Sequence, residues 1–147
     1  MRSRLRGFTL IELLVVVVIM LLAYTLAAPL VSSGVASTEM KAAARQLAAG
    51  LRTARSEAVA RRVETTVTVD VEGRRFQVAG DSRSYALPAG VELSLFTAES
   101  ERSGPSTGAI RFYPDGGSTG GRITLAARDR RYEVDVNWLT GKVTILD

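Results

Sequence analysis

The sequence predicts an α+β protein in which one long N-terminal helix packs against antiparallel β-sheets. Three observations support this class. An apolar run begins near the N-terminus, an amphipathic helical pattern follows it as far as Arg62, and short runs of alternating apolar and polar residues continue from Val63. Alternation with a period of two is typical of half-buried strands, whereas spacings of three and four are typical of helices. Strands gathered after one helix favour antiparallel sheets that pack on it.

The first half of the predicted helix, residues 8–31, is interpreted as a membrane span. Leu13 to Val31 is a run of 19 residues without a charge. As a helix it is about 28 Å long, close to the roughly 30 Å hydrocarbon core of a bilayer. A cleaved secretory signal is the alternative, because Ala27-Ala28 offers small residues, but the run is longer than such signals need. By the positive-inside rule, three preceding arginines predict a cytoplasmic N-terminus at the inner membrane: Arg2, Arg4 and Arg6.

Glu12 places a charge near the start of this apolar segment. A charge inside a span costs on the order of 2.5–3.5 kcal/mol at the centre and less near an end, so such residues usually have a partner. If the chain were cut after Gly7, the new α-amino group on Phe8 would lie near Glu12. The two charges could then neutralise each other, within one chain or between neighbouring chains.

The segment 7–12, with the sequence GFTLIE, follows a basic leader and precedes the apolar run. It resembles the class III signal of type IV pilins and type II secretion pseudopilins. The resemblance implies that residues 1–7 are a leader, removed after Gly7 by a prepilin peptidase, and that the amine of Phe8 is methylated. It also implies that Glu12 pairs with the N-terminus of a neighbouring subunit, and that Pro29 kinks the helix.

Residues 32–62 are predicted to form the amphipathic second half of the helix. Pro29 removes a backbone donor and crowds the preceding turn, so we expect a bend around residues 28–34. Beyond it, apolar residues recur at spacings of four and three, which places them on one stripe. We interpret this stripe as the face on which the sheets pack rather than as a groove for a partner. Its members are Met40, Ala44, Leu47, Leu51, Ala54 and Ala58.

Residues 63–147 are predicted to form a β-rich globular domain in the periplasm. The polar stretch 97–107 contains Gly104-Pro105 and predicts an exposed loop. The run Asp115–Gly121 is interpreted as a tight hairpin turn and not as a phosphate loop, because a strand follows it where a phosphate loop opens a helix. Eight short runs have the strand pattern: 65–71, 74–78, 84–87, 91–96, 109–113, 121–126, 131–136 and 141–146.

Residues 110–125 and 134–143 resemble the C-terminal half of the GspH/FimT family. The resemblance implies a type IV pilin-like fold and a role as a minor pseudopilin of type II secretion. Such a structural subunit of the periplasmic pseudopilus helps to export folded proteins across the outer membrane. The implied partners are other major and minor pseudopilins, the prepilin peptidase and the inner-membrane assembly platform. The alternative is a FimT/FimU-type minor type IV pilin that acts in pilus priming or DNA uptake.

The composition argues against catalysis. The chain has no histidine and no cysteine, which excludes a Ser-His-Asp arrangement and cysteine metal sites. Asp115 with Ser118 offers too few oxygens for calcium, which takes six or more. We therefore expect no enzyme, no cofactor and no metal. Without the leader arginines, sixteen basic residues face fifteen acidic ones, which is weak support for nucleic-acid binding.

Two further features are candidates for a binding surface. Arg128, Arg130 and Arg131, together with Arg122, form a basic cluster that we interpret as a solvated hairpin tip. Capture of DNA through its phosphates is the alternative. Trp138 is the only tryptophan, and we interpret it as closing one end of the core. An exposed anchor for a partner subunit is the alternative interpretation of Trp138.

Overall fold

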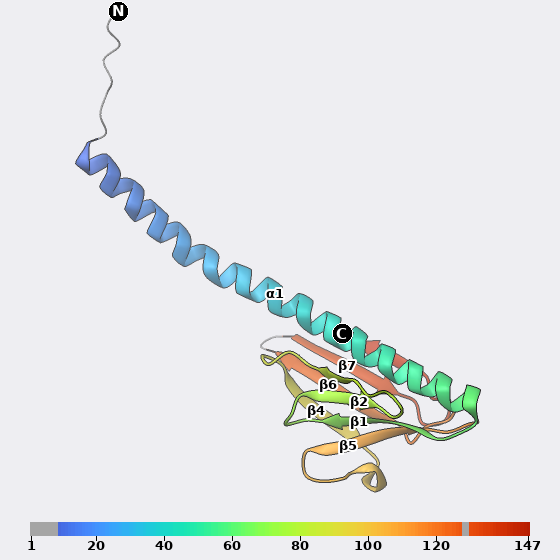
Figure 1. Cartoon of the computed structure of the whole chain (residues 1–147). Helices are drawn as coiled ribbons and strands as arrows, with labels where there is room; N and C mark the ends of the chain where they lie inside the picture. Colours follow the sequence, from blue (N-terminus) through green and yellow to red (C-terminus); the bar gives the residue numbers. More distant parts are fainter. Residues whose placement is uncertain (1–8, 128–129) are drawn as a thin grey trace, which may run out of the picture. The chain divides into compact units, whose positions relative to one another are not determined.

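The structure, a computed structural model, describes residues 9–127 and 130–147, and it leaves the side chains of residues 25–36 undescribed. The chain divides into two compact units, Met1–Val35 and Ala36–Asp147. Helix α1, Leu10–Arg61, contributes residues to both units (Figure 1). The predicted helix is confirmed apart from its ends. Helix α1 continues through Pro29 without interruption, and the kink there stays a prediction.

Within the second unit, α1 buries one face. Every member of the predicted stripe is buried, from Met40 at 1% exposed to Leu51 and Ala58 at 0%, which confirms its interpretation as the core face. Ala43 and Ala48 widen this face and are also buried. Alanines let the helix backbone approach the sheets closely, while the leucines each contribute about 1.5–3 kcal/mol on burial.

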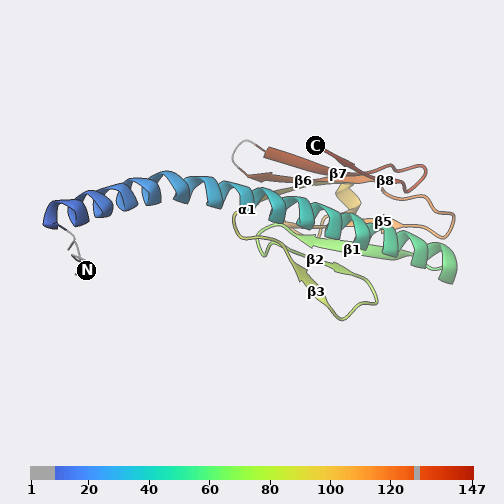
Figure 2. The same ribbon diagram turned by 90° about the horizontal axis from the view of Figure 1, so that it is seen from above.

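The described residues of the second unit form two four-stranded sheets, with the strand orders β3-β2-β1-β5 and β4-β6-β7-β8. All pairings are antiparallel, as predicted. In Figure 2, β7 and β8 appear on one side of the second half of α1, and β1, β2 and β3 on the other. The bounds are β1 Thr65–Asp70, β2 Arg75–Val78, β3 Ser84–Ala86, β4 Glu92–Thr97, β5 Thr107–Phe112, β6 Gly121–Ala127, β7 Arg130–Val136 and β8 Val143–Leu146.

The strand registers bring apolar residues together on the helix-facing side. In the first sheet Val67 of β1 pairs with Ile110 of β5, and both are completely buried. In the second sheet Ile123 of β6 pairs with Val134 of β7 in the same way. Because side chains alternate across a strand, the polar residues between them fall on the outer face.

The two sheets meet at β4 and β5. The hydroxyl of Thr97 donates a hydrogen bond to the carbonyl oxygen of Ala109 at 2.6 Å. At Gly108 a side chain would have no room, because a Cβ there would lie 2.8 Å from Leu95 Cδ2. The close approach of the two edge strands therefore depends on a glycine.

The segment 97–107 differs from the exposed loop that its composition predicts. It contains a short 3-10 helix, η1, Glu99–Glu101, and the side chain of Glu101 is buried. Arg111 of β5 holds this carboxylate, with its Nε 3.0 Å from Glu101 Oε1. The guanidinium also reaches Glu64, with Nη1 2.9 Å from Oε2. A polar loop is thus folded inward by one buried ion pair.

The glycine-rich run 115–121 forms the predicted tight turn, in which the backbone N–H of Tyr113 donates to the carbonyl oxygen of Gly117 at 3.0 Å and Phe112 pairs with Ser118. The turn does not, however, join two strands of one sheet. Strand β5 belongs to the first sheet and β6 to the second, so the segment crosses between sheets. Three of its glycines have positive φ angles, namely Gly116, Gly120 and Gly121. Glycine adopts these angles without the steric penalty of a Cβ. Local composition predicted the turn, and the sheet order decided what it connects.

Candidate functional site

Glu12 lies in the first turn of α1. Thr9 precedes the helix, and its hydroxyl accepts a hydrogen bond from the backbone N–H of Glu12 at 3.2 Å, which caps the helix start. A carboxylate at this end interacts favourably with the helix dipole. Gly7 and Phe8 lie outside the described residues, so cleavage after Gly7 and methylation of Phe8 stay predictions.

The apolar side chains of the first described turns are exposed on every face of the helix. Exposure is 85% for Leu10 and does not fall below the 43% of Val16 along this stretch. A continuous apolar surface of this kind marks a site of contact with lipid or protein. Across the part of the chain whose side chains the structure describes, no helix is long and apolar enough to cross a membrane. The predicted span, residues 8–31, stays a prediction.

Two arginines of α1 bind backbone carbonyls of the C-terminal loops. The Nε of Arg55 lies 3.2 Å from the carbonyl oxygen of Gly116 and 3.1 Å from that of Thr140. The Nη2 of Arg52 lies 3.2 Å from the carbonyl oxygen of Val143. The helix therefore fixes the crossing 113–120, the turn 137–142 that contains Trp138, and the start of β8.

The turn 137–142 has little conformational freedom. The side-chain oxygen of Asn137 accepts hydrogen bonds from the backbone N–H groups of Leu139 and Thr140, both at 3.0 Å. Gly141 has a φ of +62°, and a Cβ there would clash with the carbonyl oxygen of Gly116 and lie 2.8 Å from Arg55 Nε. The backbone N–H of Ser118 donates to the carbonyl oxygen of Trp138 at 2.8 Å.

Trp138 does not close the core. Its side chain is 67% exposed, so that interpretation is wrong. Trp138 comes two residues after the end of β7, in the turn 137–142, whose conformation is held by the backbone hydrogen bonds described above. Phe96, which the sequence analysis did not single out, is 77% exposed on the outer face of β4. Both aromatics line one open groove of about 820 Å³ on the second sheet.

The arginines of the basic cluster differ in their ion pairs. Arg122 lies between two carboxylates of β7, with Nη1 3.1 Å from Glu133 Oε2 and Nε 3.0 Å from Asp135 Oδ1. Arg131 reaches Glu133 at 3.7 Å, and Arg130 is exposed at the start of β7. Arg128 lies outside the described residues. Pairing of Arg122 with two carboxylates lowers the positive charge that a phosphate backbone would meet.

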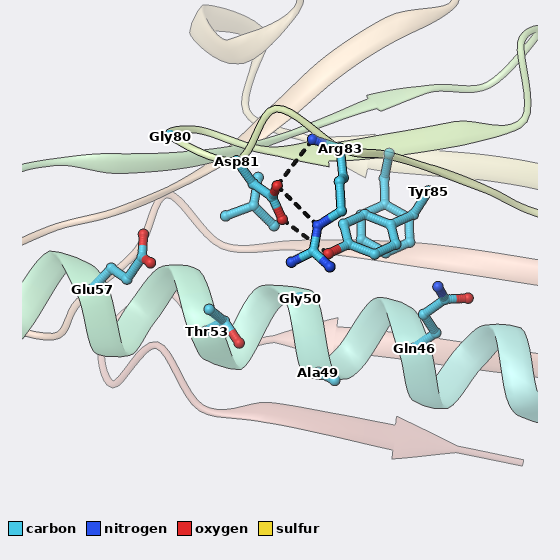
Figure 3. Close-up of a pocket in the computed structure, with 11 residues that line it drawn as sticks. Gln46, Ala49, Gly50, Thr53, Glu57, Gly80, Asp81, Arg83 and Tyr85 are labelled. Atoms are coloured by element: carbon cyan, nitrogen blue, oxygen red, sulfur yellow. Dashed lines mark hydrogen bonds and ion pairs between the residues drawn. The ribbon is translucent and has the colours of Figure 1, made fainter.

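A second groove, of about 410 Å³, runs between α1 and strand β3 (Figure 3). Gln46, Thr53 and Glu57 line it from the helix. On the opposite wall, the Tyr85 hydroxyl donates to Asp81 at 2.9 Å, and so does the backbone N–H of Arg83. The Arg83 backbone first, and then the Tyr85 hydroxyl, lower the pKa of Asp81 below its usual value. The hydrogen bond from the Tyr85 hydroxyl to Asp81 also raises the pKa of Tyr85.

Comparison with known proteins assigns the chain to a family. The family model for the type II transport protein GspH matches residues 43–141. The chain belongs to the GspH family. The model for the prokaryotic N-terminal methylation motif matches residues 2–27. Both matches agree with the resemblances found in the sequence.

Relatives of this GspH-family chain support the same assignment. It is 38% identical to type II secretion system protein H of Xanthomonas campestris pv. campestris, over 97% of this chain and 83% of the relative. Its fold is similar to the minor pseudopilin EpsH of Vibrio cholerae, with a TM-score of 0.59, 17% identity and coverage of 74% of this chain and 96% of the other. It is also similar to the type IV minor pilin FimU of Pseudomonas aeruginosa, with a TM-score of 0.58, 16% identity and coverage of 75% and 90%. The pilin-like α+β fold class is confirmed.

Sequence reasoning missed several side chains of this GspH-family domain that matter most for its surfaces. The sequence patterns assigned no role to Arg52 or Arg55, although both donate hydrogen bonds to backbone carbonyl oxygens near the C-terminus. Phe96 continues an alternating strand pattern, and its outward position in that alternation was the available signal. Nothing in the local sequence signals that Phe96 and Trp138 share a groove, because that depends on the order of strands in the sheet.

Proposed function

We propose that this GspH-family chain acts as a minor pseudopilin, a structural subunit of the periplasmic pseudopilus of type II secretion. Before assembly it resides in the inner membrane, anchored by residues 8–31, with its C-terminal domain in the periplasm. After cleavage behind Gly7 and methylation of Phe8, it joins other major and minor pseudopilins. The assembled filament helps to move folded proteins across the outer membrane.

One observation carries this proposal beyond family membership. The start of α1 exposes apolar side chains all round and has a carboxylate, Glu12, in its first turn. An apolar helix surface is stable in lipid, and it is also stable in the centre of a helical bundle. Leaving the bilayer removes lipid contact, which side-chain packing against neighbouring helices has to replace. Glu12 makes this packing specific, because its carboxylate pairs with the N-terminal amine of an adjacent subunit.

The role of Glu12 is tested by complementing a strain that lacks this subunit. We expect Glu12→Gln and Glu12→Ala to insert into the membrane normally but to lower secretion of a reporter enzyme by at least about tenfold, because a lost buried ion pair is worth several kcal/mol. Glu39→Gln is the matched control, since Glu39 is an exposed carboxylate of the same helix. Normal secretion and normal co-purification of the other pseudopilins with Glu12→Gln would contradict the pairing role.

Processing is tested separately by the mass of the mature protein. A bulky residue at the cleavage site, as in Gly7→Leu, should leave residues 1–7 attached, which intact-protein mass spectrometry measures directly. The wild-type chain should lose the leader and gain one methyl group on Phe8. A wild-type chain that keeps its leader in cells with an active prepilin peptidase would overturn this part of the proposal.

A further inference from the structure

The outer face of the second sheet presents two large aromatic side chains across one groove. Phe96 of β4 is 77% exposed and Trp138, just beyond β7, is 67% exposed. Exposed apolar side chains that gather on one patch mark interaction sites, whereas single ones are normal, and tryptophan is among the residues enriched in the energetic centres of protein interfaces. The groove between them, about 820 Å³, is the largest of those described.

Trp138 is held as a rigid anchor. Its carbonyl oxygen accepts a hydrogen bond from Ser118, and its Cβ sits close to Gly120, where an added Cβ would lie 2.9 Å away. Arg55 fixes the next loop residues through the carbonyl oxygen of Thr140. An exposed ring on a fixed backbone loses little conformational entropy when a partner covers it, which favours binding.

The floor of the groove carries a fixed set of charges. Phe96, Arg122 and Asp135 are cross-strand neighbours on β4, β6 and β7. The guanidinium of Arg122 contacts one carboxylate oxygen of Glu133, at 3.1 Å, and one of Asp135, at 3.0 Å. The ionisable groups that line the groove are thus one cation and two carboxylates, a net charge of −1. Arg131 approaches Glu133 only at 3.7 Å with its own side chain 69% exposed, a contact that contributes little.

This chemistry selects among possible occupants. A purely apolar partner would remove water from three charges without replacing their hydrogen bonds, which is unfavourable. An anion would face two carboxylates. A cation is favoured by both parts of the groove, because the aromatic faces carry negative quadrupole charge and the floor has an excess carboxylate.

We propose that the groove between Phe96 and Trp138 is a docking site for a basic side chain, arginine or lysine, that a partner subunit inserts between the two rings. Arginine fits best, because its planar guanidinium stacks on an aromatic ring while it donates hydrogen bonds to a carboxylate. That the partner is another filament subunit rests on the proposed function. Recognition of a cationic side chain does not.

The site carries its own reporter, since Trp138 is the only tryptophan in the chain. Full-length protein in a non-ionic detergent is titrated with a triarginine peptide, with triglutamine and triglutamate as matched probes, while tryptophan fluorescence is recorded. We expect a saturable change with triarginine, at least about tenfold tighter than with triglutamine, and weaker binding as salt is raised.

Variants separate the groove from the rest of the surface. Phe96→Ala removes one aromatic wall and should weaken triarginine binding by roughly threefold to tenfold. The pair Glu133→Gln with Asp135→Asn leaves Arg122 as the only charge in the groove and should reverse the preference, so that triglutamate binds better than triarginine. The matched control is Glu72→Gln with Glu99→Gln, which removes two exposed carboxylates outside the groove and should leave both affinities unchanged.

Several results would overturn the proposal. These are no saturable response to triarginine, an equal response to triglutamine, or a preference that survives neutralisation of Glu133 and Asp135. A tighter response to a neutral chito-oligosaccharide than to triarginine would replace it with a glycan site.

The partner is tested in secreting cells with a photoreactive phenylalanine analogue in place of Phe96. We expect cross-links to another pseudopilin at a segment that contains arginine or lysine. Cross-links confined to proteins outside the filament, with peptide binding intact, would overturn the assignment of the partner while the cation site stands. Filament assembly, tested through Glu12, is a separate readout, so failure of the proposed function is distinguishable from failure of this site.

Discussion

Arg55 of helix α1 and Thr140 of the last turn are 85 residues apart in sequence, and the Nε of Arg55 lies 3.1 Å from the carbonyl oxygen of Thr140. The same nitrogen lies 3.2 Å from the carbonyl oxygen of Gly116. One half-buried guanidinium thus joins the helix to the crossing between the sheets and to the turn that presents Trp138. The position of the exposed aromatic therefore depends on a residue of the helix, through the backbone of the turn that carries it.

Removal of this guanidinium should destabilise the domain. Arg55→Met keeps most of the aliphatic stem but leaves two loop carbonyls without their donor, which we expect to lower the free energy of unfolding by about 1–3 kcal/mol. The measurement is urea denaturation followed by circular dichroism. Arg45→Met is the matched control, because Arg45 is an exposed arginine on the same helix. Equal stability of the two variants would contradict a structural role for Arg55.

A side chain at position 141 should be poorly tolerated. Gly141 has a φ of +62°, and an added Cβ would meet the carbonyl oxygen of Gly116 and the Nε of Arg55. The left-handed conformation alone costs a residue with a Cβ about 1–2 kcal/mol, and the clash adds to it. We expect Gly141→Ala to lower the melting temperature markedly. Gly90→Ala should not, since a Cβ there would have no neighbour within 4 Å.

The two ion pairs of Arg111 should contribute unequally to the stability of the domain. Glu101 is 8% exposed and Glu64 is 53% exposed, so only Glu101 is held away from water. Arg111→Met leaves a buried carboxylate without its cation and should cost about 3–5 kcal/mol, whereas Glu64→Gln should cost less than about 1 kcal/mol. Unfolding experiments on the two variants and on the pair Arg111→Met with Glu101→Gln measure this. The double variant should recover part of the loss, and no recovery would contradict the explanation.

Stability should fall in acid partly through Asp81. Hydrogen bonds from the Arg83 backbone and the Tyr85 hydroxyl lower its folded-state pKa below 3.8. A carboxylate with a lowered folded pKa adds stability above its unfolded pKa, and this stability is lost as pH falls through the folded value. The wild-type unfolding free energy should therefore drop more steeply below about pH 4 than that of Asp81→Asn. Parallel pH profiles for the two proteins would exclude this contribution.

Periodicity alone predicted much of the fold. The spacing of Met40, Leu47 and Leu51 predicted the buried face of α1, because a helix repeats every 3.6 residues whatever packs on it. Alternation predicted all eight strands of the described residues to within a few residues at their ends. The segment 7–12 predicted the methylation motif that the family comparison also found. Each of these features depends only on residues that are close together in the sequence, so it could be predicted without knowledge of the tertiary structure.

What the sequence by itself determined is the α+β class, the buried face of the helix, the positions of the strands along the chain and the family. Only the tertiary structure decided that the glycine-rich run crosses between sheets, that Trp138 points outward, and that Phe96 and Trp138 face one groove. Alternation tells which side of a strand is buried, but it does not tell which strands are neighbours. The order β4-β6-β7-β8, together with the register of its pairings, places Phe96, Arg122 and Asp135 in one row.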